Sequence, residues 1–364
     1  APSARQRGRR RRGGGENYGW HVNAVIDGAT VATEVDVLGW SDLVQSLMNH
    51  SLAGTYWQLV RTAWIYIPSG TMRRLMWLRK GPVIAALYPV FALLAQALLA
   101  ILLAWVVGAV VSRLVAPGVG WIIGLPTFVA ILQWFRDHDN RFFAYYLMHD
   151  YAFAAGLNGR NPPVLETRMA RFRQQIEAAL ATDVDEVLVV GHSSGAHLAV
   201  SILADLIRDA GVRRNGPKLA LLSLGQVVPM VSFLPEAHRL RSDLRYLSMS
   251  DRLTWVDVSA PGDGCSFALC DPVAVTGVAA PNKRWPIVFS AAFTQSLSPQ
   301  RWQAMKRKYF KLHFQYLCAF DRPKDYDYFQ ITAGPLTLAE RYGDRPSSKS
   351  RIDVPASRYT SMAA

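Results

Sequence analysis

Charged residues are scarce in this chain of 364 residues, of which only 18% are Asp, Glu, Lys or Arg. Soluble domains carry nearer to about a quarter. The deficit is concentrated, because no charged residue occurs between Lys80 and Arg113 and the sequence there is apolar almost throughout. A run of about 20 apolar residues is long enough to cross the hydrocarbon core of a bilayer. The scarcity of charge therefore indicates that part of the chain faces lipid.

Cysteine is also rare, with three residues: Cys265, Cys270 and Cys318. Their small number and irregular spacing exclude a disulfide framework, although Cys265 and Cys270 could pair with each other. A structural zinc site would need more ligands than this spacing offers. We expect three reduced thiols, buried or half-buried in a cytoplasmic domain, and neither a metal nor a cofactor.

Residues 81–135 predict a transmembrane hairpin of two helices. The first apolar segment ends at Arg113, and a second uncharged segment, interrupted by Gly and Pro, runs from Leu114 to Phe135. The alternative is a buried hairpin of a soluble protein, but core helices rarely remain uncharged for so long. We therefore expect an integral membrane protein that has the lipid bilayer as a partner.

Basic residues flank the outer ends of this hairpin, and only Arg113 lies in its turn. The flanking residues are Arg73, Arg74, Arg79 and Lys80 before it and Arg136 and Arg141 after it. The positive-inside rule then places both outer ends in the cytoplasm. The sequence predicts insertion in the inner (plasma) membrane, with the rest of the chain on the cytoplasmic side.

The formal net charge of +13 is compatible with a nucleic-acid partner or with an anionic membrane surface. Six of the arginines lie within residues 1–16, which predict a basic, disordered arm. No aromatic residue interleaves these arginines to stack on bases, so we expect no nucleic-acid partner. The tail at 341–364 mixes Ser, Arg and Pro and also predicts disorder.

Residues 136–340 predict an α/β domain, to which residues 17–80 contribute an N-terminal hairpin and a helical segment. The hairpin is indicated by alternating apolar residues on either side of Asp27-Gly28. Helices are expected at 165–181, 194–209 and 235–246, and strands at 187–190, 219–224 and 253–258. Such alternation is typical of a mostly parallel sheet with helices on both faces.

The sequence Gly191-His192-Ser193-Ser194-Gly195 directly follows the first of these strands and opens a helix. That setting is what a nucleophile elbow requires, a tight turn that exposes a serine hydroxyl above the sheet. The alternative is a phosphate-binding or purely structural strand–helix turn, but a phosphate loop would have more glycines and a Lys-Ser/Thr ending. Ser193 must then adopt a strained backbone conformation, and Gly191, Gly195 and Ala196 supply the small neighbours that the turn needs. The N–H of Ser194, at the start of the helix, can point toward a developing oxyanion.

On these residues the chain resembles the α/β-hydrolase superfamily, and within it lipases and esterases, whose elbow often reads Gly-His-Ser-x-Gly. The resemblance covers about residues 165 to 320. It implies an α/β-hydrolase-like sheet and a catalytic serine, acid and histidine in that chain order. It also implies a second oxyanion donor from an earlier loop marked by His-Gly or Gly-Gly, and no such loop occurs between the hairpin and the elbow.

Chain order selects His313 as the general base, because no other histidine follows Asp263. His238 precedes the third strand, and His192 and His197 flank the serine as scaffold residues. Asp263, in the loop after the third strand, is the preferred acid, with Asp257 and Asp271 as alternatives.

The sequence thus predicts a membrane-anchored serine esterase or lipase that acts on a membrane lipid or acyl ester through Ser193, His313 and Asp263. The alternative is a catalytically degenerate, hydrolase-like binding module.

One further cluster, Asp137-His138-Asp139, resembles a metal site but lies among arginines, so we expect a solvated juxtamembrane charge cluster.

Overall fold

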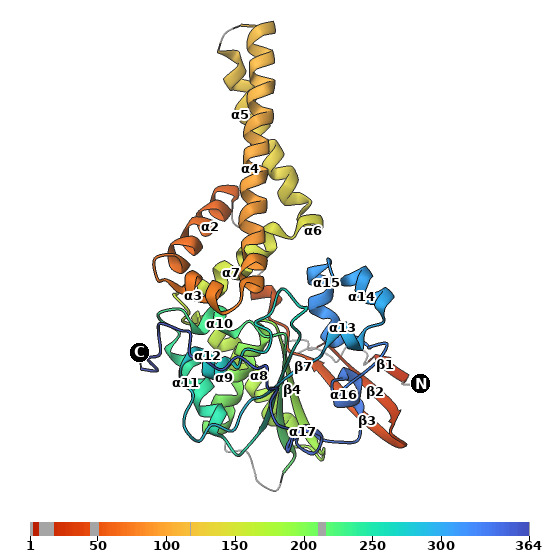
Figure 1. Cartoon of the computed structure of the whole chain (residues 1–364). Coiled ribbons are helices and arrows are strands. Elements are labelled where there is room, and N and C mark those ends of the chain that lie inside the picture. Colours follow the sequence, from red (N-terminus) through yellow and green to blue (C-terminus); the bar gives the residue numbers. More distant parts are fainter. Residues whose placement is uncertain (1–2, 7–17, 44–50, 117, 210–215, 364) are drawn as a thin grey trace. The chain divides into compact units, whose positions relative to one another are not determined.

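The structure is a computed structural model that describes residues 3–6, 18–43, 51–116, 118–209 and 216–363 (Figure 1). The chain divides into two compact units. The first comprises Ala1–Trp40, Ser69–Val83 and Leu157–Ala364, and the second comprises Ser41–Pro68 and Ile84–Gly156.

The first unit contains a four-stranded parallel sheet in the order β4-β5-β6-β7. Its strands are β4 (Glu186–His192), β5 (Lys218–Leu224), β6 (Thr254–Ser259) and β7 (Ile287–Ser290). The first three match the predicted strands to within one or two residues, because each is a short apolar run rich in branched side chains. The fourth strand is not among the predicted elements. The α/β character of this region is therefore confirmed.

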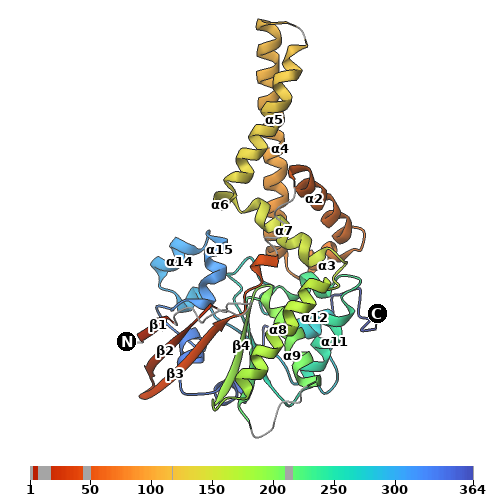
Figure 2. The ribbon, with the colours of Figure 1, turned by 180° about the vertical axis from the view of Figure 1, so that it is seen from behind.

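Helices cover both faces of this sheet. Figure 2 shows α8 (Pro163–Leu180) lying along β4 and beside α9 (Gly195–Asp209), and α11 (His238–Met249) packs on α9. The opposite face packs into a core that includes Leu222, Val256 and Tyr316. The remaining helices of this unit are α3 (Thr71–Leu78), α10 (Val228–Ser232), α12 (Pro272–Thr276), α13 (Phe293–Ser296), α14 (Pro299–Met305), α15 (Tyr309–His313), the 3-10 helix η1 (Phe314–Leu317), α16 (Tyr328–Ala333) and α17 (Leu338–Tyr342).

The predicted N-terminal hairpin is confirmed as β2 (Tyr18–Ile26) and β3 (Ala29–Val37). Asp27 and Gly28 have φ values of 53° and 80°, the pair of positive angles that a two-residue hairpin turn requires. A further antiparallel strand, β1 (Ser3–Gln6), pairs with β2. This strand lies in the arm predicted to be disordered, so that prediction is wrong for Ser3–Gln6, and residues 7–16 lie outside the described residues.

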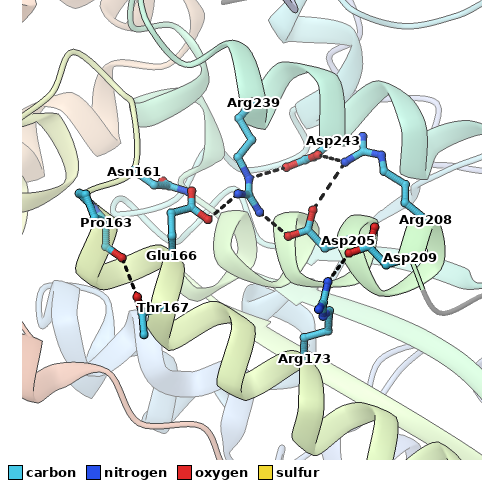
Figure 3. Close-up of polar contacts among 10 residues, drawn as sticks. All are labelled: Asn161, Pro163, Glu166, Thr167, Arg173, Asp205, Arg208, Asp209, Arg239 and Asp243. Atoms are coloured by element: carbon cyan, nitrogen blue, oxygen red, sulfur yellow. Dashed lines mark hydrogen bonds and ion pairs between the residues drawn. The ribbon is translucent and has the colours of Figure 1, made fainter.

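An ion-pair network ties α8, α9 and α11 together (Figure 3). Arg239 of α11 contacts Glu166 of α8, and lies 2.5 Å from Asp205 of α9. Arg208 of α9 lies 2.5 Å from the buried Asp243 of α11. The side chains of Arg239, Glu166 and Asp205 are about a third exposed, so we assign the network a positioning role more than a large contribution to stability. It fixes α9, the helix that opens next to Ser193.

The C-terminal tail, predicted to be disordered, instead packs on the first unit. Ile352 forms a parallel bridge with Cys270 and donates its N–H to the Leu269 carbonyl at 2.7 Å. The carbonyl of Ser361 accepts a 2.6 Å hydrogen bond from Nε of Arg241, which is fully buried. The prediction of disorder is therefore wrong for residues 341–363, because contacts distant in sequence outweigh the polar composition, and Ala364 lies outside the described residues.

Two helices are long and apolar enough to cross a membrane, α4 (Lys80–Leu114) and α5 (Val119–Asp137), and apart from the first residues of α4 they lie in the second unit. Their apolar side chains are largely exposed, including Trp105 at 68% and Trp121 at 84%, which does not fit the buried core hairpin of a soluble protein. At about 1.5 Å per residue, α4 exceeds the roughly 30 Å of a hydrocarbon core.

The two helices lie side by side in both views and contact each other through small residues (Figures 1 and 2). A Cβ added at Gly108 of α4 would lie 2.9 Å from the Gly120 carbonyl oxygen of α5. Gly124 would similarly approach the Ala104 carbonyl oxygen at 3.2 Å. Gly120 and Gly124 form a GxxxG spacing, and such small residues let two helix backbones approach closely in a bilayer.

Residues 41–68 and 136–156, which the sequence pattern assigns to the α/β domain or its N-terminal segment, pack in the second unit instead. They form α2 (Leu52–Tyr66), α6 (Asp139–Phe142) and α7 (Ala144–Ala155). Asp139, expected to be solvated, is only 8% exposed, and its carboxylate caps α7 by accepting from the N–H groups of Ala144, Tyr145 and Tyr146 at 2.7–3.0 Å. The prediction that Asp139 is solvated is therefore wrong, because its carboxylate is buried as the cap of the α7 N-terminus.

Candidate active site

Ser193 occupies the tight turn between β4 and α9, and its φ of 56° lies in the left-handed region. Its N–H donates to the Leu224 carbonyl of the neighbouring strand β5 at 2.9 Å. A Cβ added at Gly191 would lie 2.8 Å from Cα of Ala196, so this position requires glycine. Gly195 is different, because a Cβ there would meet no atom within 4 Å. The expected steric demand on Gly195 is therefore wrong.

His313 and Asp263 are in direct contact. Nδ1 of His313 lies 2.8 Å from Oδ2 of Asp263, and the two side chains are only 6% and 0% exposed. Oδ2 also accepts from the Tyr316 hydroxyl at 3.0 Å, and Oδ1 accepts from the Cys265 N–H at 2.9 Å. Three donors therefore fix the carboxylate, which in turn fixes the imidazole.

These contacts keep Asp263 ionised. Burial alone would raise the pKa of Asp263, but the hydrogen bond and charge of His313 and the Cys265 N–H outweigh it, so the pKa lies below its usual range. A charged carboxylate accepts from Nδ1–H and leaves Nε2 as the basic nitrogen of His313. That is the tautomer a general base needs.

Neither alternative carboxylate contacts His313. Asp257 lies inside β6, where it accepts a 2.6 Å hydrogen bond from Ser223, and burial raises its pKa to about 8. Asp271 caps α12 through the Val273 and Ala274 N–H groups and lies 2.6 Å from Nζ of Lys283. Of the three candidate acids, the structure brings only Asp263 to the imidazole.

The serine and the histidine lie at the same edge of the sheet. His192 donates from Nε2 to the His313 carbonyl at 2.9 Å, and the two rings lie 4.6 Å apart. Gly225 follows Leu224, the acceptor of the Ser193 N–H, and its added Cβ would lie 3.2 Å from Cε1 of His313. Within the described residues, no hydrogen bond joins Ser193 and His313, and catalytic contacts are often longer without substrate.

The other histidines near the elbow are poor general bases. Burial, and then the neighbouring His313, lower the pKa of His192 to about 4. Burial alone lowers the pKa of His197 to about 4. His238 lies elsewhere, where Nδ1 contacts Arg241 and the Ser361 carbonyl.

Asp263, Cys265 and His313 place three potential metal-ligand atoms within 4.8 Å of one another. The direct His313–Asp263 hydrogen bond already uses two of them. Burial and then the charge of Asp263 raise the pKa of the Cys265 thiol to about 12. The arrangement therefore favours an acid–base pair over a metal centre.

All three cysteines are free, and Cys318 is exposed, contrary to the expectation of burial.

The Ser194 N–H lies at the start of α9, where the first N–H groups of a helix have no intrahelical partner. It can therefore serve as one oxyanion donor. A second donor is not identified among the described residues.

Sequence reasoning missed two contributors to the site. Tyr316 donates to Asp263 and accepts the Ala260 N–H at 2.8 Å, so it joins the acid loop to the histidine segment. Gly225, with a φ of 52°, leaves room for the rings of Tyr316 and His313. The signal for Tyr316 is its position three residues after His313, whereas Gly225 stands out only as the glycine after a strand.

No protein-family model matches the chain, nor does any curated protein or solved structure. The geometry of the site therefore has to carry the assignment of a function.

Proposed function

We propose that this chain is a membrane-anchored serine hydrolase that cleaves carboxylic esters, of lipids or other acyl compounds, through an acyl-enzyme. The observation that carries the proposal is the His313–Asp263 hydrogen bond beside a serine held at positive φ in a strand–helix turn. Ser193, Asp263 and His313 follow strands β4, β6 and β7 in that order. A structural turn alone does not require this combination.

The geometry supports a two-step reaction. Ser193 Oγ attacks the ester carbonyl while Nε2 of His313 takes the hydroxyl proton, and Asp263 stabilises the resulting imidazolium. The Ser194 N–H donates to the oxyanion. Collapse expels the alcohol, which receives the proton from His313. Water then attacks the acyl-enzyme with His313 again as base, which releases the carboxylic acid and restores Ser193.

The candidate membrane spans favour a lipid or acyl ester as substrate and the bilayer as partner. The first residues of α4, which begins at Lys80, belong to the first unit. The unit that carries the site is therefore joined directly to a candidate membrane span, which supports a substrate found in the membrane. The basic flanks of the hairpin favour the inner (plasma) membrane with the site on the cytoplasmic side. An accessibility assay with cysteines introduced beside Arg113 and beside Arg136 would test this orientation.

A fluorophosphonate probe tests the activated serine. The detergent-solubilised full chain should be labelled, and Ser193→Ala and His313→Ala should not. Ser194→Ala is the matched control, because it removes a neighbouring hydroxyl and keeps the backbone N–H, so it should be labelled like the parent. Equal labelling of Ser193→Ala would refute the assignment.

The second candidate is a catalytically degenerate, hydrolase-like binding module anchored in the membrane. It is favoured by the missing second oxyanion donor and by the missing Ser193–His313 hydrogen bond in the described part of the chain. A parent protein that shows a cooperative thermal transition but no labelling, and no hydrolysis of a panel of acyl esters, would support this candidate over the enzyme.

A further inference from the structure

A strongly basic surface segment with exposed aromatic rings lies directly before and after His313. We call it the basic–aromatic patch, and it consists of Lys306, Arg307, Lys308, Tyr309, Lys311 and Phe314. All six side chains are exposed, with Tyr309 at 59% and Phe314 at 53%. Lys311 of α15 and Phe314, the first residue of η1, are three residues apart, so they occupy neighbouring positions on the surface of this segment.

The charge of this patch is not neutralised locally. No acidic residue occurs between Lys306 and Phe320. Among the residues that the structure describes, none forms an ion pair with the four cations of the patch. A surface that combines uncompensated cations with exposed aromatic rings is suited to a partner that offers both anionic groups and an apolar layer.

The patch is built onto the loop that carries the proposed triad acid. A Cβ added at Gly262 would lie 2.9 Å from the ring of Trp302 in α14, and one at Gly264 would lie 3.3 Å from the ring of Tyr309. The two glycines flanking Asp263 therefore let α14 and α15 pack closely on this loop. Phe314 also contacts His192 of the elbow, with ring centroids 5.0 Å apart.

The same loop contacts the beginning of a candidate membrane span. A Cβ at Gly81, in the first turn of α4, would lie 2.9 Å from the Gly264 carbonyl oxygen. Gly264 is thus close both to Tyr309 of the patch and to the first turn of α4. Gly81, Gly264 and Tyr309 all belong to the first unit, so within that unit the first turn of α4 and the patch lie close together.

We propose that the basic–aromatic patch docks on the surface of an anionic lipid bilayer. Lys306, Arg307, Lys308 and Lys311 contact headgroup phosphates, and Tyr309 and Phe314 enter the interfacial layer, where aromatic rings are favourably placed. Each cation near an anionic surface contributes roughly fivefold to the docking equilibrium. If the proposed function holds, docking also presents the site to esters of lipids at that surface.

The test uses the full chain in lipid nanodiscs and reads docking directly. A Phe314→Cys variant, with Cys318→Ser to remove the exposed native thiol, carries an environment-sensitive fluorophore. We expect its emission to shift to the blue in discs containing phosphatidylglycerol relative to discs of phosphatidylcholine alone. The shift should diminish at high salt, because surface charges are then screened.

Two multiple variants separate this patch from general basicity. Replacing Lys306, Arg307, Lys308 and Lys311 by Gln should abolish the shift. Replacing four other exposed cations, Arg322, Lys324, Lys349 and Arg358, by Gln is the matched control and should preserve it. A thermal transition like that of the parent confirms that each variant is folded.

Several results would overturn the proposal. They are an emission that does not depend on the lipid, a shift lost equally in the control variant, or binding of an oligonucleotide that requires the same four cations in competition with anionic lipid. Because the readout is not catalytic, Ser193→Ala should keep the shift. A chain that docks but is not labelled by fluorophosphonate would refute the hydrolase and leave the docking surface intact.

Discussion

Replacement of Asp263 by Asn tests the proposed triad with little change in shape. In the parent, Oδ2 accepts from both His313 and Tyr316, and Oδ1 accepts from the Cys265 N–H. The Tyr316 hydroxyl is itself an acceptor for the Ala260 N–H, so its proton is directed at Asp263. An asparagine has only one acceptor oxygen, and its NH₂ group must therefore face at least one donor.

Each orientation of the amide in the Asp263→Asn variant has a cost that follows from these contacts. If the NH₂ group faces Cys265, two N–H donors oppose each other in a buried site, which costs about 1–3 kcal/mol of stability. If the NH₂ group faces His313, the imidazole must carry its proton on Nε2, and Nε2 then cannot accept the Ser193 proton. The variant therefore loses stability in one orientation and the general base in the other.

We expect Asp263→Asn to reduce the rate of fluorophosphonate labelling and of ester hydrolysis by about ten-thousandfold, the typical effect of imposing the wrong tautomer in such a triad. That factor corresponds to about 5.5 kcal/mol of transition-state stabilisation. The stability difference from the parent should shrink as the pH falls below about 4. The low pKa of Asp263 contributes stability above the pKa of the unfolded chain, and this contribution is lost as the folded carboxylate is protonated.

Asp257→Asn is the matched control, because Asp257 is equally buried but hydrogen-bonds Ser223 and does not contact His313. It should retain labelling close to that of the parent. The triad assignment is refuted if Asp263→Asn keeps more than a small fraction of the parent rate while folded, or if Asp257→Asn is the variant that loses it.

Three other measurements test contacts around this site and at the C-terminus. Gly225→Ala should lower the melting temperature and slow fluorophosphonate labelling at least tenfold. The added Cβ would lie 2.6 Å from Cε2 of Tyr316, and the φ of 52° at this position is unfavourable for alanine. Gly195→Ala is the control and should change neither quantity, because a Cβ there meets no atom within 4 Å. Asp257→Asn should become progressively more stable than the parent as the pH rises from about 4 to 8. The pKa of the buried Asp257 is raised to about 8, so the parent loses stability over the range in which only its unfolded chain ionises. Melting temperatures of the two proteins that show no such divergence with pH would contradict this. Arg241→Met should destabilise the fold by about 2–5 kcal/mol and expose the C-terminal segment to limited proteolysis. The substitution removes the buried donor to four backbone carbonyls, those of Ser232, Leu234, Pro235 and Ser361. An unchanged urea denaturation midpoint would show that these hydrogen bonds contribute little to stability.

Elements with a local cause could be predicted from the amino-acid sequence alone. The branched residues before Gly191 specify β4, the Asp27-Gly28 pair specifies a turn with two positive φ angles, and the uncharged run after Lys80 specifies α4. The strained conformation of Ser193 also follows from its immediate neighbours. Periodicity, side-chain size and charge act over a few residues, so these features can be inferred without knowledge of the fold.

Contacts between groups far apart in the chain depend on the fold and could not be predicted in this way. Asp263 and His313 are 50 residues apart, and their contact depends on the register of parallel strands and on the packing of Tyr316. The prediction of a disordered tail fails for the same reason, since Ile352 and Ser361 are ordered by Leu269 and Arg241, which lie far away in sequence. Composition measures the average preference of a segment for water, whereas order is decided by the specific buried partners that the fold supplies.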